Sequence, residues 1–357
     1  MLRLFQFIGK RLKGVGVRAS WLWLALVLGL LAAFPFVSPS IYYVSVLTTA
    51  ALYAVLAMSY DLLIGYTGIV SFGHALFFGI GAYGAGILMR DVGLGFFPAL
   101  VVVVLLSALM AVVVGLLSLR VSGVYFSMVT LAFAEFFHIL VQKLYRLTGG
   151  DDGFSRIPTP HWLGSQVHKF YFVLVFAVIL FYIGSRLVKS PVGSVWMAIR
   201  ENETRAKLIG YNTFFYKLLV MVISGMMAGL TGGVYAVVVN FAYPGFISVG
   251  TTINVLLMVI IGGVGSLYGS ILGALIVRSL GQILSSYFHS WLLMFGLIYV
   301  VIVLFFPAGI IGSSRAFLAR RQARAGLSAP GAGASTGGAL GGSSHGQATD
   351  SPGRAVD

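Results

Sequence analysis

The most restrictive feature of this sequence is the length of its uncharged apolar stretches. Four of them, Trp21–Tyr60, Val92–Leu119, Leu218–Val277 and Ser279–Ser314, contain no Asp, Glu, Lys or Arg. A membrane-spanning helix needs about 20 apolar residues, so each of the last two stretches is long enough for more than one span. Of the 357 residues, 59% are hydrophobic and 9% are charged. A soluble domain of this length lacks the interior to bury so many apolar side chains, and the sequence therefore predicts an all-α, polytopic transmembrane helical bundle.

The apolar stretches divide into about eight to ten membrane segments, the lower number applying if the glycine-interrupted segments 68–89 and 250–264 are re-entrant. Basic residues gather in the N-terminal segment, in the loop 186–217 and after residue 314. Because short cytoplasmic loops are enriched in Lys and Arg, ten segments place these three regions and both termini in the cytoplasm. The predicted segments are 21–37, 41–63, 68–89, 96–119, 123–146, 168–188, 214–240, 250–264, 269–286 and 290–308.

The chain is predicted to have three parts. Residues 1–20 form a basic cytoplasmic segment, and residues 21–312 form a transmembrane domain that contains a cytoplasmic loop at 189–213. Residues 313–357 form a cytoplasmic tail that is rich in Gly, Ser and Ala and poor in large apolar residues. Such a composition cannot bury enough surface to fold, so we expect the tail to be disordered.

Glycines are spaced for close helix contact in the longest apolar stretch. Gly225, Gly229 and Gly233 lie four residues apart. On a helix this spacing produces a smooth face that neighbouring backbones can approach closely in lipid. The contact is either plain packing or a seam along which helices move.

The composition and the motifs exclude several functions. The net charge is +14, but the basic residues lie between apolar segments and form no continuous face for nucleic acid. The lack of cysteine excludes disulfides and cysteine nucleophiles. Residues 79–84 fit the dinucleotide pattern Gly-x-Gly-x-x-Gly, but they lie in an apolar segment with no preceding strand. No Gly-x4-Gly-Lys-Ser/Thr loop occurs, so no cofactor is expected in this chain. If transport is driven by ATP, another subunit must bind the ATP and Mg²⁺.

Neither a metal site nor a catalytic site is predicted. Glu135 and His138 form a Glu-x-x-His pair, but a di-iron bundle needs two such pairs and two further Glu residues. No Gly-x-Ser-x-Gly nucleophile motif occurs. The chain is therefore not expected to be an enzyme.

The stretch 190–213 is the most distinctive polar part of the sequence. It is amphipathic, carries charges of both signs and lies between apolar segments on the predicted cytoplasmic side. Pro191 suits the start of a helix and Gly210 suits a stop. A short cytoplasmic helix of this kind is suited to docking in a groove of another protein, and the alternative is a surface helix without a partner.

Five ordered stretches resemble one family, the permeases of branched-chain amino acid ABC importers. The resemblance covers roughly residues 40–310 and is nearer to the Leu/Ile/Val M-type permease than to its H-type partner. Urea and short-chain amide importers are similar in the same stretches. The stretches are Asp61–Tyr83, Gly123–Ala134, Thr148–Gly153, Ala198–Glu203 with Gly210–Asn212, and Ile260–Gly269.

The resemblance implies an assembly in the bacterial inner membrane. It would contain a second homologous permease subunit, two cytoplasmic ATPase subunits and a periplasmic substrate-binding protein. The stretch 189–213 would be the coupling loop, but its match to the docking motif Glu-Ala-Ala-x3-Gly is limited to Ala206 and Gly210. The residues expected to couple to the ATPase are Glu201, Glu203, Arg205, Ala206 and Gly210.

Transport by alternating access needs polar groups along the path. Asp61, His74 and Glu135 are ionisable at or near membrane depth, where each should face a cavity or a partner, although Asp61 is also compatible with the cytoplasmic end of its span and His74 with plain packing. The expected path residues are Ser71, His74, Glu135, Asn240 and Asn254. The alternatives are a related urea or amide importer, and a secondary transporter that acts alone.

Overall fold

The computed structural model describes residues 40–287 without a break, together with residues 34–35, 293–294, 296–297, 299–300 and 309. The basic segment 1–20 and the tail 313–357 lie outside the described residues. The first predicted membrane segment, 21–37, and the last, 290–308, lie largely outside them.

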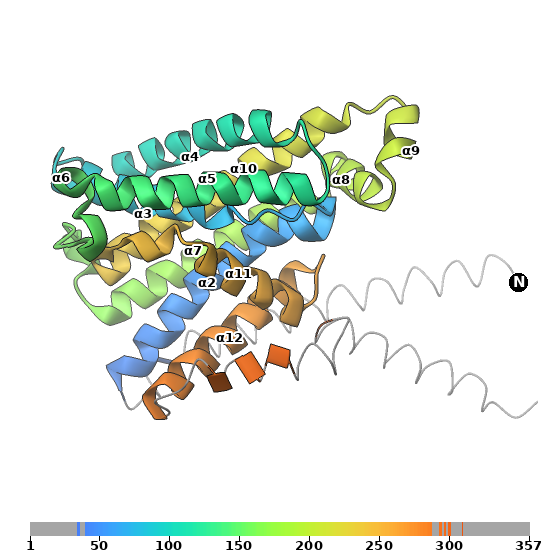
Figure 1. The fold of residues 1–357 in the computed structure, drawn as a ribbon. Helices are drawn as coiled ribbons and strands as arrows, with labels where there is room; N and C mark the ends of the chain where they lie inside the picture. Colours follow the sequence, from blue (N-terminus) through green and yellow to red (C-terminus); the bar gives the residue numbers. More distant parts are fainter. Residues whose placement is uncertain are drawn as a thin grey trace, which may run out of the picture. The chain divides into compact units, whose positions relative to one another are not determined.

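The described part of the chain is a bundle of helices, as the sequence predicts (Figure 1). Six of its helices are long and apolar enough to cross a membrane. Consecutive long helices run in opposite directions where a short turn joins them, as α4 and α5 do. The six are α2 (Ile41–Thr67), α4 (Phe96–Ser118), α5 (Val124–Lys143), α7 (Gln166–Val188), α10 (Thr213–Val239) and α12 (Leu267–Tyr287).

Two further membrane segments are shorter and begin inside the bundle. Helix α3 (His74–Arg90) has 17 residues and α11 (Val249–Gly262) has 14, so they span about 25 and 21 Å at 1.5 Å per residue. The predicted segment 68–89 is therefore helical only from His74. Its first six residues leave the end of α2 through Gly68, which has a left-handed backbone, and return into the bundle as an irregular stretch.

The irregular stretch 68–73 is stabilised by side chains, because backbone groups away from water need partners. Hydroxyl groups from α2 and α5 take the place of a helical ladder. The hydrogen bonds are Tyr60 Oη to Ser71 O at 2.9 Å, Ser127 Oγ to Val70 O at 2.7 Å, and Phe72 N to Thr130 Oγ1 at 3.2 Å.

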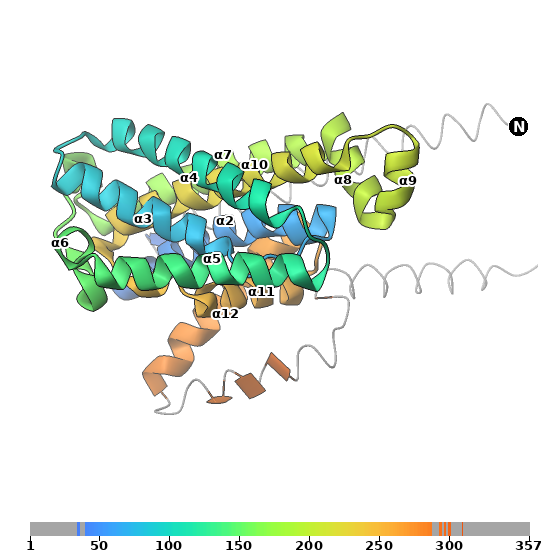
Figure 2. The same ribbon diagram turned by 45° about the horizontal axis from the view of Figure 1, so that its top comes forward.

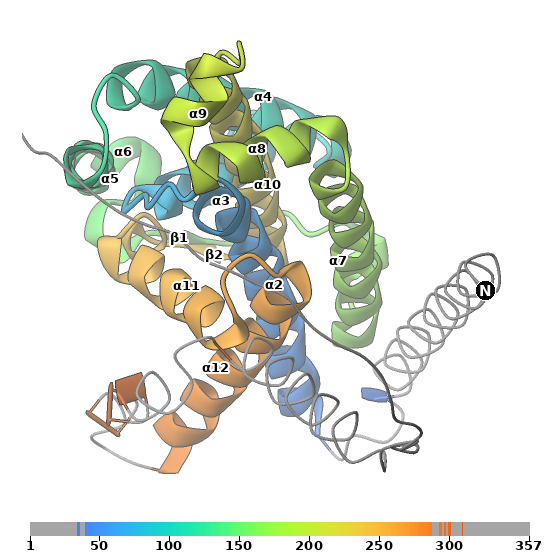
Figure 3. The ribbon, with the colours of Figure 1, turned by 90° about the vertical axis from the view of Figure 1, so that its right-hand side faces the viewer.

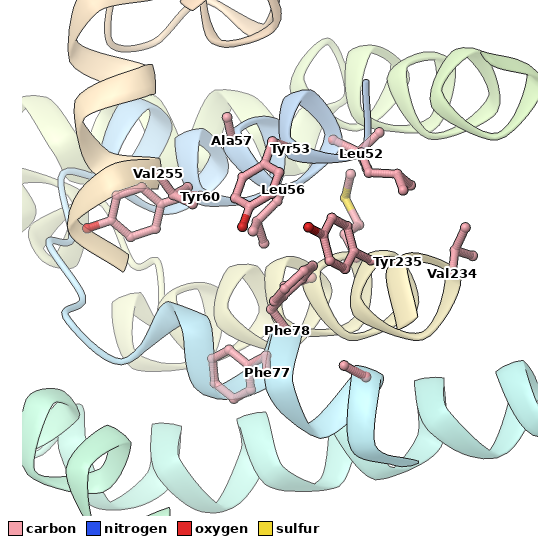
Figure 4. Close-up of a cluster of buried hydrophobic side chains, with 14 of the residues drawn as sticks. Leu52, Tyr53, Leu56, Ala57, Tyr60, Phe77, Phe78, Val234, Tyr235 and Val255 are labelled. Atoms are coloured by element: carbon pink, nitrogen blue, oxygen red, sulfur yellow. The ribbon is translucent and has the colours of Figure 1, made fainter. Parts of the chain in front are cut away.

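The glycines of α10 allow its close contact with α3 and α4. A Cβ atom on Gly229 would lie 1.9 Å from Ser107 Oγ of α4, and one on Gly81 of α3 would lie 1.8 Å from the Gly229 carbonyl oxygen. The spacing of these glycines therefore marks a tight contact between backbones. Figure 4 shows how α10 and α3 contribute Tyr235, Phe77 and Phe78 to the core that faces α2.

Short elements lie at the two ends of the bundle. Helices α8 (Pro191–Glu201) and α9 (Glu203–Leu208) project at one end and face the viewer in Figure 3. The opposite end, where Figures 1 and 2 label α6, contains a two-stranded antiparallel sheet in which Phe154 pairs with Ala242. Figure 3 labels its strands β1 and β2. The elements there are α6 (Tyr145–Thr148), η1 (Gly150–Asp152), β1 (Phe154–Ser155), η2 (His161–Leu163), β2 (Phe241–Ala242) and η3 (Pro244–Phe246).

Candidate functional site

The loop 189–213 forms two short helices at one end of the bundle. Helix α8 starts at Pro191 because proline needs no backbone donor in the first turn, and Ser190 Oγ accepts from Gly193 N at 3.4 Å. Asn202 has an extended backbone that separates the two helices. Its side chain caps α9 by accepting a hydrogen bond from Arg205 N at 2.9 Å. The single helix predicted here is therefore a helix–break–helix unit.

A small apolar cluster holds α8 and α9 together. Ala206 of α9 is buried and packs with Val195 and Ile199 of α8. Trp196 is fully buried, and its indole Nε1 donates to the Tyr216 carbonyl oxygen of α10 at 3.0 Å. The unit is thus fixed to the long helix that follows it.

Glu203 connects α9 to the first turns of α10. Its carboxylate lies 2.5 Å from Lys217 Nζ and 3.0 Å from Lys207 Nζ, and it accepts from Thr213 Oγ1 at 3.1 Å. Burial by itself would raise the pKa of Glu203, but the hydrogen bonds from Lys217 and Lys207 lower this pKa to about 2. Glu203 is therefore ionised at neutral pH, and its ion pairs connect α9 to α10.

The far end of the unit exposes apolar side chains. Leu208 is 83% exposed and Ile209 is 70% exposed. Gly210 follows with φ +100°, and nothing lies within 4 Å of a Cβ built on it, so the position needs glycine for its backbone and not for space. Two adjacent exposed aliphatic residues on a fixed unit form a candidate contact with another protein.

The five predicted coupling residues separate into two groups. Glu201, Arg205 and Gly210 are exposed, which suits residues that meet a partner. Glu203 and Ala206 instead face the chain's own α10 and α8. Their positions fit a role in holding α8, α9 and α10 together. The spacing of residues in the sequence could not distinguish this role from docking to a partner.

One arginine connects the unit to the interior of the bundle. Arg200 of α8 donates from its guanidinium to the Gly65 carbonyl oxygen near the end of α2. The same place is occupied by the α11–α12 turn, where Gly265 N donates to Asp61 Oδ1 at 2.8 Å. Asp61 thus sits on α2 one turn before Gly65, at the end of the bundle that carries α8. Arg200 was not among the predicted coupling residues, because in the sequence it is only one of several basic residues in the loop 186–217.

The interior path candidates Ser71 and His74 lie where α3 begins. Both are 1% exposed. His74 Nε2 is 2.9 Å from Ser59 Oγ of α2, and the next backbone amide, Ala75 N, donates to Thr252 Oγ1 of α11 at 3.0 Å. The starts of the two short helices therefore meet inside the bundle, an arrangement that lines substrate sites in many transporters.

The other three path candidates are not brought to this place. Asn240 is exposed and ends α10 with a left-handed backbone at φ 61°. Asn254 is exposed on α11, and Glu135 is half-buried on α5 without a hydrogen bond or ion pair to the described residues. The five predicted path residues consequently do not form one site.

Comparison with known proteins identifies the family. The family model described as branched-chain amino acid transport system / permease component matches residues 42–307. The chain belongs to this family. It is 28% identical to the high-affinity branched-chain amino acid transport system permease protein LivM of Escherichia coli, covering 87% of this chain and 79% of the relative. The Salmonella typhimurium protein of the same name is also 28% identical, over 79% of this chain and 73% of the relative.

A more distant relative comes from an archaeon. The probable branched-chain amino acid transport permease protein LivM of Methanocaldococcus jannaschii is 25% identical over 73% of this permease and 90% of the relative. No solved structure matches the permease. Family membership makes it a multi-pass membrane subunit of a transporter complex.

One charged residue of the permease, Arg278 of α12, was not among the predicted site residues. Arg278 separates the uncharged stretches Leu218–Val277 and Ser279–Ser314, so its position was visible in the sequence. Its guanidinium carbon lies 4.5 Å from the centre of the Tyr53 ring of α2. Among the described residues, no group of three His, Asp or Glu side chains is placed to hold a metal ion.

Proposed function

We propose that this chain is the membrane-spanning permease subunit of an ATP-driven importer for branched-chain amino acids. Its relatives are named for branched-chain amino acid transport, which supports this substrate class. In this proposal residues 21–312 form the permease domain in the bacterial inner membrane, and segment 1–20 and tail 313–357 are cytoplasmic. The partners are a second permease subunit, two ATPase subunits and a periplasmic binding protein.

The observation that carries the coupling role is the exposed pair Leu208 and Ile209 on a unit fixed to the bundle. Helices α8 and α9 lie at the end of the bundle that the basic residues assign to the cytoplasm. An ATPase groove that receives the two aliphatic side chains would remove them from water, which favours association by the hydrophobic effect. Glu201 and Arg205 would then make polar contacts at the rim.

The structure offers a direct route from the docked unit into the membrane. Movement of α8 would displace Arg200 and with it the Gly65 carbonyl of α2. The α11–α12 turn would follow, because Gly265 is hydrogen-bonded to Asp61 of the same helix. A ligand is carried only if it binds differently to the two resulting states of the bundle, so ATP binding and hydrolysis would change which end of the path is open.

The test is co-purification with the products of the neighbouring genes. The ATPase subunits should remain bound to the permease and should be released by Leu208→Ser with Ile209→Ser. Substitution of Glu201, Arg205 or Gly210 should weaken the same contact. Val92→Ser is the matched control, because Val92 is 62% exposed in the turn before α4, at the other end of the bundle.

The result also separates the competing functions. If no ATPase is retained by the unmodified chain and uptake in vesicles follows an ion gradient, the permease is a secondary transporter and the proposal is wrong. If ATPases are retained but urea or a short amide is taken up instead of L-leucine, the coupling role stands and the substrate is that of the related importers.

A further inference from the structure

Arg278 occupies an unusual position for an arginine in a membrane helix. It is the only charged residue between Leu218 and Ser314. A charged side chain at membrane depth is unfavourable unless it reaches water or a partner of opposite charge. Arg278 does not extend away from the bundle, because its guanidinium stacks on the ring of Tyr53 in α2.

Only part of the Arg278 guanidinium is hydrogen-bonded to the described residues. It interacts with the hydroxyl group of Tyr235, which also interacts with the hydroxyl of Tyr53. Figure 4 shows the two tyrosine hydroxyls turned toward each other between α2 and α10. Nε of Arg278 is buried, and none of the described residues accepts a hydrogen bond from it. The guanidinium from α12 and the hydroxyl groups from α2 and α10 therefore meet at one place inside the bundle, where the Nε–H donor of Arg278 still needs an acceptor.

The described part of the chain supplies no carboxylate to Arg278. Seven of the nine acidic residues lie there, and the ion pairs they form involve only Arg90, Lys207 and Lys217. The remaining two, Asp350 and Asp357, lie at the end of the tail. The membrane segments contribute only Asp61, which is bonded to Gly265 beside α8, and Glu135 on α5. The counter-charge is therefore expected to come from a molecule other than this chain.

A row of aromatic rings leads from the cluster to the surface opposite α8. Tyr53 and Tyr235 are 8% and 4% exposed. The Tyr235 ring lies 5.1 Å from that of Phe246 in η3, and the Phe246 ring lies 4.5 Å from that of Tyr243, which is 40% exposed. The cluster is thus about two aromatic side chains below the end of the bundle that faces outward in the proposed orientation.

We propose that Arg278, Tyr53 and Tyr235 form a carboxylate-binding site of the transport path, which is closed in this structure by η3. Its ligand is the α-carboxylate of an amino acid, since a guanidinium and two hydroxyls match a carboxylate and the nearby rings of Phe78 and Phe246 suit an aliphatic side chain. This ligand rests on the proposed function, whereas the anion-binding character of the site does not. Arg278 would select for the carboxylate after the ligand leaves the binding protein.

Cysteine labelling tests the charge of the site directly, because this chain contains no native cysteine and the complex without an introduced cysteine corrects for any cysteine of the partner subunits. Tyr235→Cys in the intact complex is reacted with an anionic and with a cationic methanethiosulfonate. Each rate is divided by that of the same reagent with a free thiol. Both reagents reach the cysteine only when the site opens, so the ratio of the two normalised rates does not depend on how often it opens. We expect at least a tenfold preference for the anionic reagent, loss of this preference when Arg278→Gln is added, and protection by L-leucine but not by L-leucinamide.

Uptake of L-leucine by the reconstituted transporter gives a second readout. Arg278→Gln should lower the uptake at least tenfold and Arg278→Lys should lower it less, because lysine keeps the charge but not the planar fork. Arg186→Gln is the matched control. Arg186 also stacks on a tyrosine, Tyr182, with a ring distance of 5.3 Å, but at an exposed position near the end of α7, and its replacement should leave uptake unchanged.

Three results would decide against the site. Equal normalised rates for the two reagents would show that no anion-attracting site exists. Uptake by Arg278→Gln equal to that of Arg186→Gln would show that the arginine is not used. Release of the second permease by Arg278→Gln, with the labelling preference intact, would assign the arginine to a subunit contact. If L-leucine is neither taken up nor protective but the preference still depends on Arg278, the substrate is wrong and the site stands.

Discussion

Replacement of Glu203 by Gln is expected to loosen α9 from α10 and to lower the thermal stability of the permease. The carboxylate of Glu203 lies between Lys217 and Lys207, at 2.5 and 3.0 Å. Lys217 is the stronger partner, since its side chain is 16% exposed and that of Lys207 is 60% exposed. Gln keeps the shape of the side chain and removes the charge, so the substitution isolates the electrostatic contribution.

The magnitude follows from the pKa. A pKa of about 2 for Glu203, against an ordinary value of 4.5, corresponds to roughly 3.4 kcal/mol at about 1.36 kcal/mol per tenfold change in proton affinity. The side chain is 33% exposed, so solvent screening and the ordering of two lysines reduce this value. We expect Glu203→Gln to lower the free energy of unfolding by about 1–2 kcal/mol. For a helical domain of this size the midpoint should fall by roughly 2–6 °C.

The effect should depend on pH in one direction. The folded-state pKa of Glu203 is depressed, so the stabilisation is fully present above the unfolded-state pKa near 4.5 and is lost as the pH falls through about 2. The difference in stability between the unmodified chain and the Gln variant should therefore be constant from about pH 8 to 5 and should shrink below pH 4.5.

The assay is the thermal midpoint of the detergent-solubilised permease, measured between pH 8 and the lowest pH at which it stays monodisperse. Glu201→Gln is the matched control, because Glu201 is exposed on the same unit and forms no ion pair within the described residues. Its midpoint should change by less than about 1 °C. Equal midpoints for the two variants at pH 7 would refute the assignment of Glu203 to an internal ion pair.

Three other substitutions test the contacts inside the bundle. Asp61→Ala should lower stability by about 1–3 kcal/mol in thermal melts, because it leaves the Gly265 amide without its acceptor, and Asp61→Asn should be milder because the amide oxygen can replace it. Gly265→Ala should lower the midpoint as well, since its φ of +83° is unfavourable for alanine by about 1–2 kcal/mol. Gly81→Ala should abolish folded protein in size-exclusion chromatography, because its Cβ would lie 1.8 Å from the Gly229 carbonyl oxygen. Gly84→Ala on the same helix is the control, because a Cβ there would lie 3.2 Å from its nearest neighbour, a side-chain atom of Val103, and this variant should still yield folded protein. Loss of folded protein for Gly84→Ala too would show that α3 tolerates no such substitution.

The bounds of several membrane helices were predictable from the local sequence. The segments 96–119 and 168–188 match α4 and α7 within two residues, because a run of apolar side chains fixes helix length in lipid regardless of its neighbours. The segment 68–89, for which the sequence left a continuous span and a re-entrant segment open, is helical only from His74. Apolar composition does not distinguish a helix from the irregular stretch before His74, which is stabilised by hydroxyls of distant helices.

The pair of helices α8 and α9 was predictable in position but not in detail. Its charges and its Pro191 and Gly210 located it in the chain, and its order of motifs matched the family. The inward positions of Glu203 and Ala206 depend on α8 folding back against α9 and α10. Spacing along a single helix could not show this, since Asn202 interrupts the helix and changes the direction of the chain.

The sequence by itself determined that this chain is a helical membrane protein of the branched-chain amino acid permease family, because hydropathy and ordered motifs are local properties. Only the tertiary structure decided which polar residues meet. Arg200 reaches Gly65, Asp61 binds Gly265, Ala75 binds Thr252, and Arg278 stacks on Tyr53. Each pair is more than 100 residues apart and depends on how helices cross, and that crossing is set by the packing of small and large side chains over whole helix faces.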